Sequence, residues 1–290
     1  MSLPLFPEFK LIGTEDRDIL TAAIARYPSP ACEIHFANLF MWRHFERSKF
    51  TVINDNLCVL CAPPSEAAYF LEPIGDTKIE ATVGVCLSFA PRLSRVTESF
   101  ALQYAGPFRH EPDRDNFDYV YRAEDLAQLK GKKYDGKRNR IRKIERSHVF
   151  SYARFNRTDL TDCLSLLEKW LEVKAGSDAV FGRVWRMVIT EALEHGEETG
   201  LLGGVFRLAG RVVAFSFGSM LTPDTAVIPI EIVDPGYDGL SQLVNREFIR
   251  REWAGCRYIN REQDNGSPGL RRAKTSYHPH HFVKKYNIWG

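Results

Sequence analysis

The order of helical and strand patterns in the second half is the feature that most constrains how this chain can fold. Leu160, Leu164, Leu167 and Leu171 recur at the spacing of one helix face, and a second helical pattern covers 184–193. The patterns that follow are strands over 202–208, 211–220 and 226–233, a helix over 240–253, a strand over 257–261, a helix over 270–275 and a strand over 282–288. This order predicts an α/β (α+β) unit of about 140 residues built on a sheet.

The first half has a less regular pattern. It predicts a helix over 16–27, a hairpin over 50–62, and strands over 69–74 and 118–121, while 81–90 and 95–105 each fit a helix or a strand. Domains usually contain about 100–150 residues, so a chain of 290 predicts two. We place the boundary near residue 150, which gives domains 1–149 and 150–290.

Positive charge is concentrated in one segment near the middle of the chain. The net charge is only +2, but residues 130–146 hold nine basic and two acidic residues, so the rest of the chain is at −5. We favour an anion-binding surface here, with tRNA as a candidate partner, over a solvated helix that buries only Ile141 and Ile144. The candidate anion-binding residues of this segment are Lys130, Lys132, Lys133, Lys137 and Arg138.

Cysteine usage and hydropathy predict a reduced, cytoplasmic protein. No apolar run reaches the roughly 18 residues that a membrane helix needs, and the N-terminus has no secretory signal pattern. Cys58 and Cys61 form a lone CxxC in an apolar, strand-like run, where two small core residues are favoured over a redox or zinc pair. His278, His280 and His281 are crowded around a proline, and we favour a surface turn, so we expect no metal.

The loop at 235–239 has the composition of an anion-binding turn. It follows a strand and precedes a helix, and Gly236 and Gly239 would let backbone N–H groups approach a phosphate at the helix N-terminus. A simple tight turn is the alternative. The surrounding topology is similar to that of the GNAT acyltransferases, in which this loop grips the pyrophosphate of acyl-CoA. The loop here departs from their usual signature, because Asp234 or Pro235 stands before the first glycine.

Several longer motifs resemble one bacterial family. They are Asn38-Leu-Phe-Met-Trp42, Phe117-Asp-Tyr-Val-Tyr121, 129–134 with 137–139, Ile259-Asn-Arg-Glu262 with Asp264, and 269–279 with its Lys274, Ser276 and Tyr277. Together they resemble DUF2156, which matches the C-terminal domain of phosphatidylglycerol lysyltransferases. The resemblance implies two tandem GNAT-like domains, each a mixed, mostly antiparallel sheet flanked by helices. It also implies aminoacyl transfer from aminoacyl-tRNA, without the membrane flippase part.

Five residues are candidates for acyl-transfer chemistry. Glu231 lies in an apolar strand and is the candidate base, although an ion pair with an arginine explains it equally well. Tyr277 corresponds to the general-acid tyrosine of GNAT-like enzymes, Asn260 would donate to a carbonyl, and Arg261 and Lys274 would hold an anionic donor. Core packing of the tyrosine and a buried Arg–Glu network are the alternatives.

The functional prediction is a GNAT-like acyltransferase that acts on an amine or hydroxyl. Its donor would be aminoacyl-tRNA or acyl-CoA, and no other cofactor is predicted. A non-catalytic RNA- or nucleotide-binding module on a degenerate transferase fold is one alternative, and an acyl-CoA-dependent N-acetyltransferase is another. The acceptor stays open.

Overall fold

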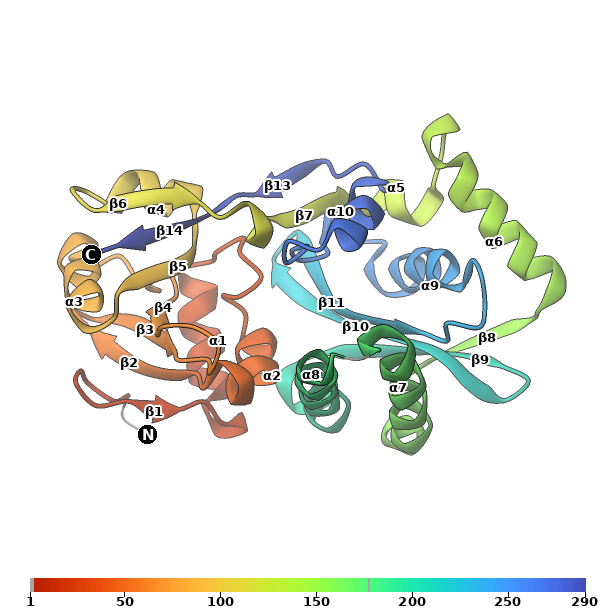
Figure 1. Cartoon of the computed structure of the whole chain (residues 1–290), viewed down its shortest axis with the longest axis horizontal. Helices are drawn as coiled ribbons and strands as arrows, with labels where there is room; N and C mark the ends of the chain where they lie inside the picture. The colour runs from red at the N-terminus through yellow and green to blue at the C-terminus, as the bar shows by residue number, and fades with distance from the viewer. Residues whose placement is uncertain (1–2, 177) are drawn as a thin grey trace. The chain divides into compact units, whose positions relative to one another are not determined.

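The chain divides into two compact units in a computed structural model that describes residues 3–176 and 178–290 (Figure 1). Unit 1 comprises Met1–Tyr119, Glu262–Lys274 and His281–Gly290. Unit 2 comprises Val120–Arg261 and Thr275–His280. Each unit is therefore built from segments that are distant in the sequence. Among the described residues, no helix is long and apolar enough to span a membrane.

Unit 1 is built on a seven-stranded sheet. Its strand order is β1-β2-β3-β4-β5-β14-β6, and every neighbouring pair is antiparallel except β4–β5. The strands are β1 (Lys10–Leu11), β2 (Lys49–Ile53), β3 (Asn56–Cys61), β4 (Tyr69–Phe70), β5 (Arg92–Thr97), β6 (Arg109–Pro112) and β14 (Lys285–Trp289). The helices are η1 (Thr14–Asp16), α1 (Arg17–Arg26), α2 (Phe36–Glu46), α3 (Ile79–Phe89), α4 (Glu98–Tyr104), η2 (Arg114–Asn116) and α10 (Pro268–Thr275).

Strand β3 shows how this sheet is buried on both faces. All six of its residues are buried, and alternate side chains enter two different hydrophobic cores. Leu57, Val59 and Cys61 pack in the core that includes residues of α1 and α2, whereas Cys58 and Leu60 pack in the core that includes residues of α3 and α4. Cys58 and Cys61 therefore point to opposite faces of the sheet, which confirms the prediction of two small core residues.

Unit 2 is built on strands of the second sheet, in the order β7-β12-β11-β10-β9-β8. They are β7 (Asp118–Arg122), β8 (Phe150–Arg154), β9 (Leu202–Leu208), β10 (Arg211–Thr222), β11 (Thr225–Val233) and β12 (Tyr258–Asn260). The remaining strand, β13 (His281–Val283), is formed by a segment of unit 1. The helices are α5 (Ala123–Gln128), η3 (Lys132–Tyr134), α6 (Asp135–Ser147), η4 (Arg157–Asp159), α7 (Leu160–Ala175), α8 (Ala179–Thr199), α9 (Leu240–Phe248) and the π-helical turn η5 (Ile249–Trp253). Helices α7 and α8 cover one face of the sheet and α9 the other (Figure 1).

Most of the predicted elements are confirmed. Of the two segments left open between helix and strand, 81–90 lie in helix α3, and 95–105 contain the end of β5 followed by α4. The predicted strand over 69–74 is shorter, because β4 covers only Tyr69–Phe70. The predicted last strand over 282–288 is two strands, β13 and β14. Both sheets are mixed, mostly antiparallel and flanked by helices, so the predicted fold class of two tandem domains is confirmed.

The predicted boundary near residue 150 does not coincide with the division of the chain. Strand β7 precedes residue 150 but pairs with β12 through Val120–Arg122, in unit 2. Strand β14 lies at the C-terminus but pairs with β5 and β6, in unit 1. The basic segment also belongs to unit 2, not to the end of an N-terminal domain. Chain length and the order of the patterns predicted two domains that each occupy one half of the sequence. In the structure, each sheet is completed by a strand from the opposite half of the chain.

Candidate active site

The candidate site in unit 2 lies where two parallel strands separate. Strands β11 and β12 pair only over three residues, from Thr225 opposite Tyr258 to Val227 opposite Asn260. Strand β12 then ends, while β11 continues to Val233 and stays paired with β10 on its other side. Glu231 lies on this continuing part of β11. The sequence therefore positions a carboxylate beyond the end of the parallel partner strand.

Glu231 is held by two side chains of unit 2. The Arg261 guanidinium lies 3.3 Å from Glu231 Oε2, and Asn245 of α9 donates a hydrogen bond of 3.1 Å to the same oxygen. The side chains of Arg261 and Glu231 are only 15% and 17% exposed, so each charge needs its partner. The arginine ion pair considered from the sequence is thus present. The role of Glu231 as a base stays a prediction.

Two cations flank the ring of Tyr277. The Lys137 Nζ atom lies 3.5 Å from the ring centroid, and the Arg261 guanidinium carbon lies 5.0 Å from it. Lys137 also donates a 2.7 Å hydrogen bond to Ser276 Oγ. Burial, together with repulsion from the Arg261 and Arg140 guanidiniums, lowers the pKa of Lys137 to about 8.

Tyr277 itself is 6% exposed. Burial raises the pKa of its phenol well above the usual value, so the hydroxyl keeps its proton at neutral pH. The cluster therefore combines a protonated phenol, a carboxylate and two partly desolvated cations. Such a set can bind an anionic group and supply or accept a proton next to it. We call Lys137, Glu231, Arg261, Ser276 and Tyr277 the unit 2 cluster.

The basic segment is anchored to this cluster by Tyr134. Tyr134 is completely buried, and its hydroxyl donates a 2.9 Å hydrogen bond to the backbone carbonyl of Tyr277. Helix α6, which follows, buries Ile141 and Ile144 as the apolar stripe predicted from the sequence. Because Lys137 lies in the first turn of this helix, the anchor fixes its position beside the ring.

The other basic residues of the segment have different surroundings. Arg138 donates to the Leu129 and Gly131 carbonyls and pairs with Asp135, so it stabilises the turn before α6 rather than presenting a free charge. Lys133 lies 3.7 Å from Asp125. The exposed basic residues of the segment are Lys130, Lys132, Lys133, Arg140, Arg142, Lys143 and Arg146. They form a cationic surface on η3 and α6. Arg138 is not part of this surface, and its contacts do not support a role in anion binding.

Several backbone N–H groups of the glycine loop are bonded within the loop, since Tyr237 donates to the Asp234 carbonyl and Leu240 to the Tyr237 carbonyl. The backbone N–H of Gly236 donates to Asp234 Oδ1 at 2.9 Å. Gly239 has φ of +92°, and a Cβ there would approach the Arg140 carbonyl oxygen to 2.7 Å. The glycine is required because α6 packs closely against the loop. The structure therefore favours the tight turn over the phosphate loop at Gly236 and Gly239.

Two other predicted site residues, Asn260 and Lys274, are not members of the unit 2 cluster. Asn260 is completely buried in β12, and its role as a donor to a carbonyl stays a prediction. Lys274 belongs to unit 1, is 8% exposed, and donates to the carbonyl oxygens of Glu262 (3.0 Å) and Gln263 (2.5 Å). Its ammonium thus stabilises the turn at Glu262 and Gln263, and its role in holding the donor stays a prediction.

One group of described residues has the composition of a metal site. Only Cys32, Glu33 and Asp118 bring three ligand atoms within 4.8 Å of one another in the ranges 3–176 and 178–290. The Lys285 ammonium lies among them, 2.5 Å from Glu33 and 2.6 Å from Asp118. This ammonium already compensates the two carboxylates, so the arrangement does not favour a divalent ion.

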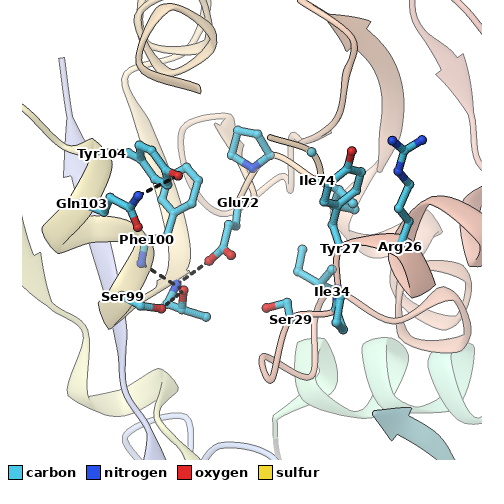
Figure 2. A pocket seen from close by; sticks show the side chains of 14 residues that line it. Arg26, Tyr27, Ser29, Ile34, Glu72, Ile74, Ser99, Phe100, Gln103 and Tyr104 are labelled. Carbon is cyan, nitrogen blue, oxygen red and sulfur yellow. Dashed lines mark hydrogen bonds between the residues drawn. The ribbon is translucent and has the colours of Figure 1, made fainter. Parts of the chain in front are cut away.

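Unit 1 also contains a cavity of about 330 Å³ that no sequence pattern indicated (Figure 2). Glu72 points into it beside Ser99 and Phe100, and accepts a 2.7 Å hydrogen bond from the Thr97 N–H. Burial raises the pKa of Glu72. Glu72 lies in a loop and Ser99 in α4, and no periodic pattern of the sequence links them, so the sequence could not have indicated this cavity.

The comparison with known families identifies the chain. Residues 24–289 match the family described as "Phosphatidylglycerol lysyltransferase, C-terminal". The chain belongs to this family. The match covers both units and confirms the resemblance found in the sequence motifs.

Solved structures agree with this assignment. A conserved protein of unknown function from Bacteroides thetaiotaomicron is 30% identical, with a TM-score of 0.90 and 99% of both chains covered. The L-PGS of Bacillus licheniformis is 14% identical, with a TM-score of 0.68 and 100% and 94% coverage of the two chains. A DUF2156 domain of a putative lysylphosphatidylglycerol synthetase from Agrobacterium fabrum is 14% identical, with a TM-score of 0.62 and 95% and 91% coverage. The last two show a shared fold. No curated protein matches the chain.

Proposed function

We propose that this family member is an acyltransferase that moves an aminoacyl group from aminoacyl-tRNA to an amine or hydroxyl. The observation that carries the proposal is the unit 2 cluster, where Lys137 and Arg261 flank the ring of Tyr277 next to Glu231. The family match and the exposed basic surface of α6 support tRNA as the anionic donor. Use of tRNA would place the reaction in the cytoplasm.

In this proposal, each group of the cluster has one task. Glu231 takes the proton from the acceptor, whose electron pair then forms a bond to the ester carbonyl carbon. Arg261 and Lys137 hold the anionic end of the donor and balance charge on the carbonyl oxygen. The bond between that carbon and the tRNA ribose oxygen breaks, and Tyr277 gives its proton to the ribose oxygen.

Glu231→Gln tests the base. It keeps the size of the side chain and removes its proton affinity, so we expect single-turnover transfer from radiolabelled aminoacyl-tRNA to fall by about 10²–10⁴-fold. Phosphatidylglycerol vesicles, amino sugars and short peptides serve as acceptors. Glu194→Gln, on the exposed surface of α8, is the matched control and should transfer at the wild-type rate. Equal rates in Glu231→Gln and the wild type would remove Glu231 from the mechanism.

A binding module without catalysis is the second candidate. The glycine loop favours it, because the Gly236 N–H already donates a hydrogen bond to the Asp234 side chain. The same hydrogen bond disfavours binding of the acyl-CoA pyrophosphate at this loop. Equilibrium binding of bulk tRNA, CoA and acetyl-CoA over a salt series separates the candidates. Salt-dependent tRNA binding without turnover of any donor supports the binding module. Tight binding of acetyl-CoA would contradict the interpretation of the glycine loop as a simple tight turn.

A further inference from the structure

Unit 1 contains a second cavity, of about 200 Å³, that the proposed mechanism does not use. This volume corresponds to about seven water molecules, enough for a small ligand. One part of its wall is apolar, formed by Leu39, Trp42, Phe45 and Leu71. The other part is charged, and it includes Glu33, Glu46, Arg95 and Glu262. We call it the acidic cavity, and all of its lining residues belong to unit 1.

The charges around this cavity do not balance. Glu46 is paired with Arg95 at 3.3 Å and accepts a 2.6 Å hydrogen bond from the Tyr69 hydroxyl. On the opposite side Glu33, Asp118 and Glu262 stand against the Lys285 and Lys274 ammonium groups. Four carboxyl groups thus face three cations, and burial raises the pKa of one of them, Glu262, to about 6. The remaining negative charge lies in a largely buried environment, where a cation would be bound strongly.

Two acceptor atoms of the lining residues have no donor. Neither Glu33 Oε1 nor Asn38 Oδ1 has a hydrogen-bond partner among the residues that the structure describes, although Glu33 is 8% and Asn38 5% exposed. The Asn38 amide orientation is fixed, because its Nδ2 donates to the Cys32 carbonyl (2.8 Å) and to Glu262 Oε1 (2.7 Å). A buried acceptor without a donor costs about 1–3 kcal/mol. A group in the cavity that donates hydrogen bonds would therefore satisfy both acceptors.

The backbone is strained at two of the charged lining residues. Arg95 has φ of +58° and Glu262 has φ of +56°, in the left-handed region that residues with a Cβ rarely adopt. Arg95 lies in a β-bulge, where the register of β5 against β14 shifts between Val96 and Leu93. Strain of this kind persists where the surrounding structure over-determines it, as at binding sites.

We propose that the acidic cavity binds the ammonium group of a small primary amine whose carbon chain lies against Trp42 and Phe45. The ammonium would donate to Glu33 Oε1 and Asn38 Oδ1, and a third proton would face Glu262. The aromatic and leucine side chains would bury the apolar chain. This inference is independent of the proposed transferase activity, because it concerns unit 1 and requires no donor.

Equilibrium titration of the full chain with three six-carbon probes tests the charge requirement. n-Hexylamine, 1-hexanol and hexanoate share the chain but carry a cation, a neutral hydroxyl and an anion. Calorimetry at pH 7.5 should give hexylamine at least tenfold tighter binding than either of the others. Equal affinity for hexylamine and hexanol, or tighter binding of hexanoate, overturns the proposal.

Variants locate the binding. Glu33→Gln should weaken hexylamine binding by tenfold or more, while Glu80→Gln, an exposed glutamate on α3 of the same unit, should leave it unchanged. Because Glu33 also pairs with Lys285, Trp42→Leu serves as a second variant outside that ion pair and should weaken hexylamine at least threefold. Unchanged affinity in a folded variant of either kind would mean that the amine binds elsewhere.

Discussion

At the scale of single residues, the environment of Lys137 decides what the basic segment can do. Residues 130–146 contain nine basic side chains, and charge density alone does not distinguish among them. Lys137 differs because it lies over the Tyr277 ring and close to Arg261, and burial together with the neighbouring guanidiniums lowers its pKa to about 8. Its charge therefore changes in a pH range where exposed lysines stay protonated.

This pKa predicts two pH effects of opposite sign. Lys137 holds an anion only when protonated, so its contribution to tRNA affinity should fall as pH rises from 7 to 9. The unfolded chain, with a lysine pKa near 10.5, binds more protons than the folded chain between pH 8 and 10.5. The wild type should therefore gain stability relative to Lys137→Met as pH rises through that window.

Filter binding and urea unfolding at pH 7, 8 and 9 measure the two effects. Lys143→Met is the matched control, since Lys143 lies on the same helix with its side chain 76% exposed. A tRNA affinity ratio between the wild type and Lys137→Met that stays constant from pH 7 to 9 would contradict the assigned environment.

At the scale of elements, the contact between α6 and the loop before α9 explains the glycines better than ligand binding does. Gly239 adopts φ of +92° directly against the Arg140 carbonyl, and the Gly236 N–H is bonded to Asp234. A phosphate-binding loop and a tight turn that packs against a helix can both have this strand–loop–helix pattern with two glycines. That local pattern does not indicate that α6, whose Arg140 stands about 100 positions earlier in the chain, packs closely against Gly239.

Substitution of each glycine by alanine tests this explanation. Gly239→Ala introduces a strained φ and a clash with backbone, so the free energy of unfolding should fall by about 1–2 kcal/mol or more. Gly236→Ala is the matched control, since its new Cβ would meet only Asp234 Oδ1 at 3.2 Å and its φ is not positive. Chemical denaturation measures both. Equal stability of the two variants would show that the α6 contact does not require the glycine.

At the scale of the whole molecule, each sheet depends on a strand from the other half of the sequence. Strand β7 completes the sheet of unit 2 beside β12, and β14 lies between β5 and β6 in unit 1. Ile288 of β14 is completely buried in a hydrophobic core of unit 1. A cut near residue 150 would leave both sheets incomplete.

Fragments 1–149 and 150–290 should therefore fail to fold separately. Fragment 1–149 lacks β14 from the interior of its sheet, and fragment 150–290 lacks β7. Each should show no cooperative thermal transition alone, whereas a co-expressed pair should co-purify and unfold cooperatively. Calorimetry and co-purification check this outcome, and cooperative unfolding of either isolated fragment would contradict it.

The sequence by itself determined the elements, the fold class and the family. Apolar periodicity is a local property, so α7, the hairpin of β2 and β3, and the buried stripe of Ile141 and Ile144 were predicted correctly. The long motifs led to the family because they are unusual in combination.

Only the tertiary structure decided which distant segments meet. The pairings of β7 and β14, the cations over Tyr277 and the contact of Asn38 with Glu262 in the acidic cavity join residues up to 224 positions apart. Lys274 and Arg138 have the positive charge that an anion site requires. In the structure, however, both side chains donate hydrogen bonds to nearby backbone carbonyl groups. The sequence determines the charge and the hydrogen-bonding capacity of each side chain. Tertiary packing determines which group each side chain interacts with.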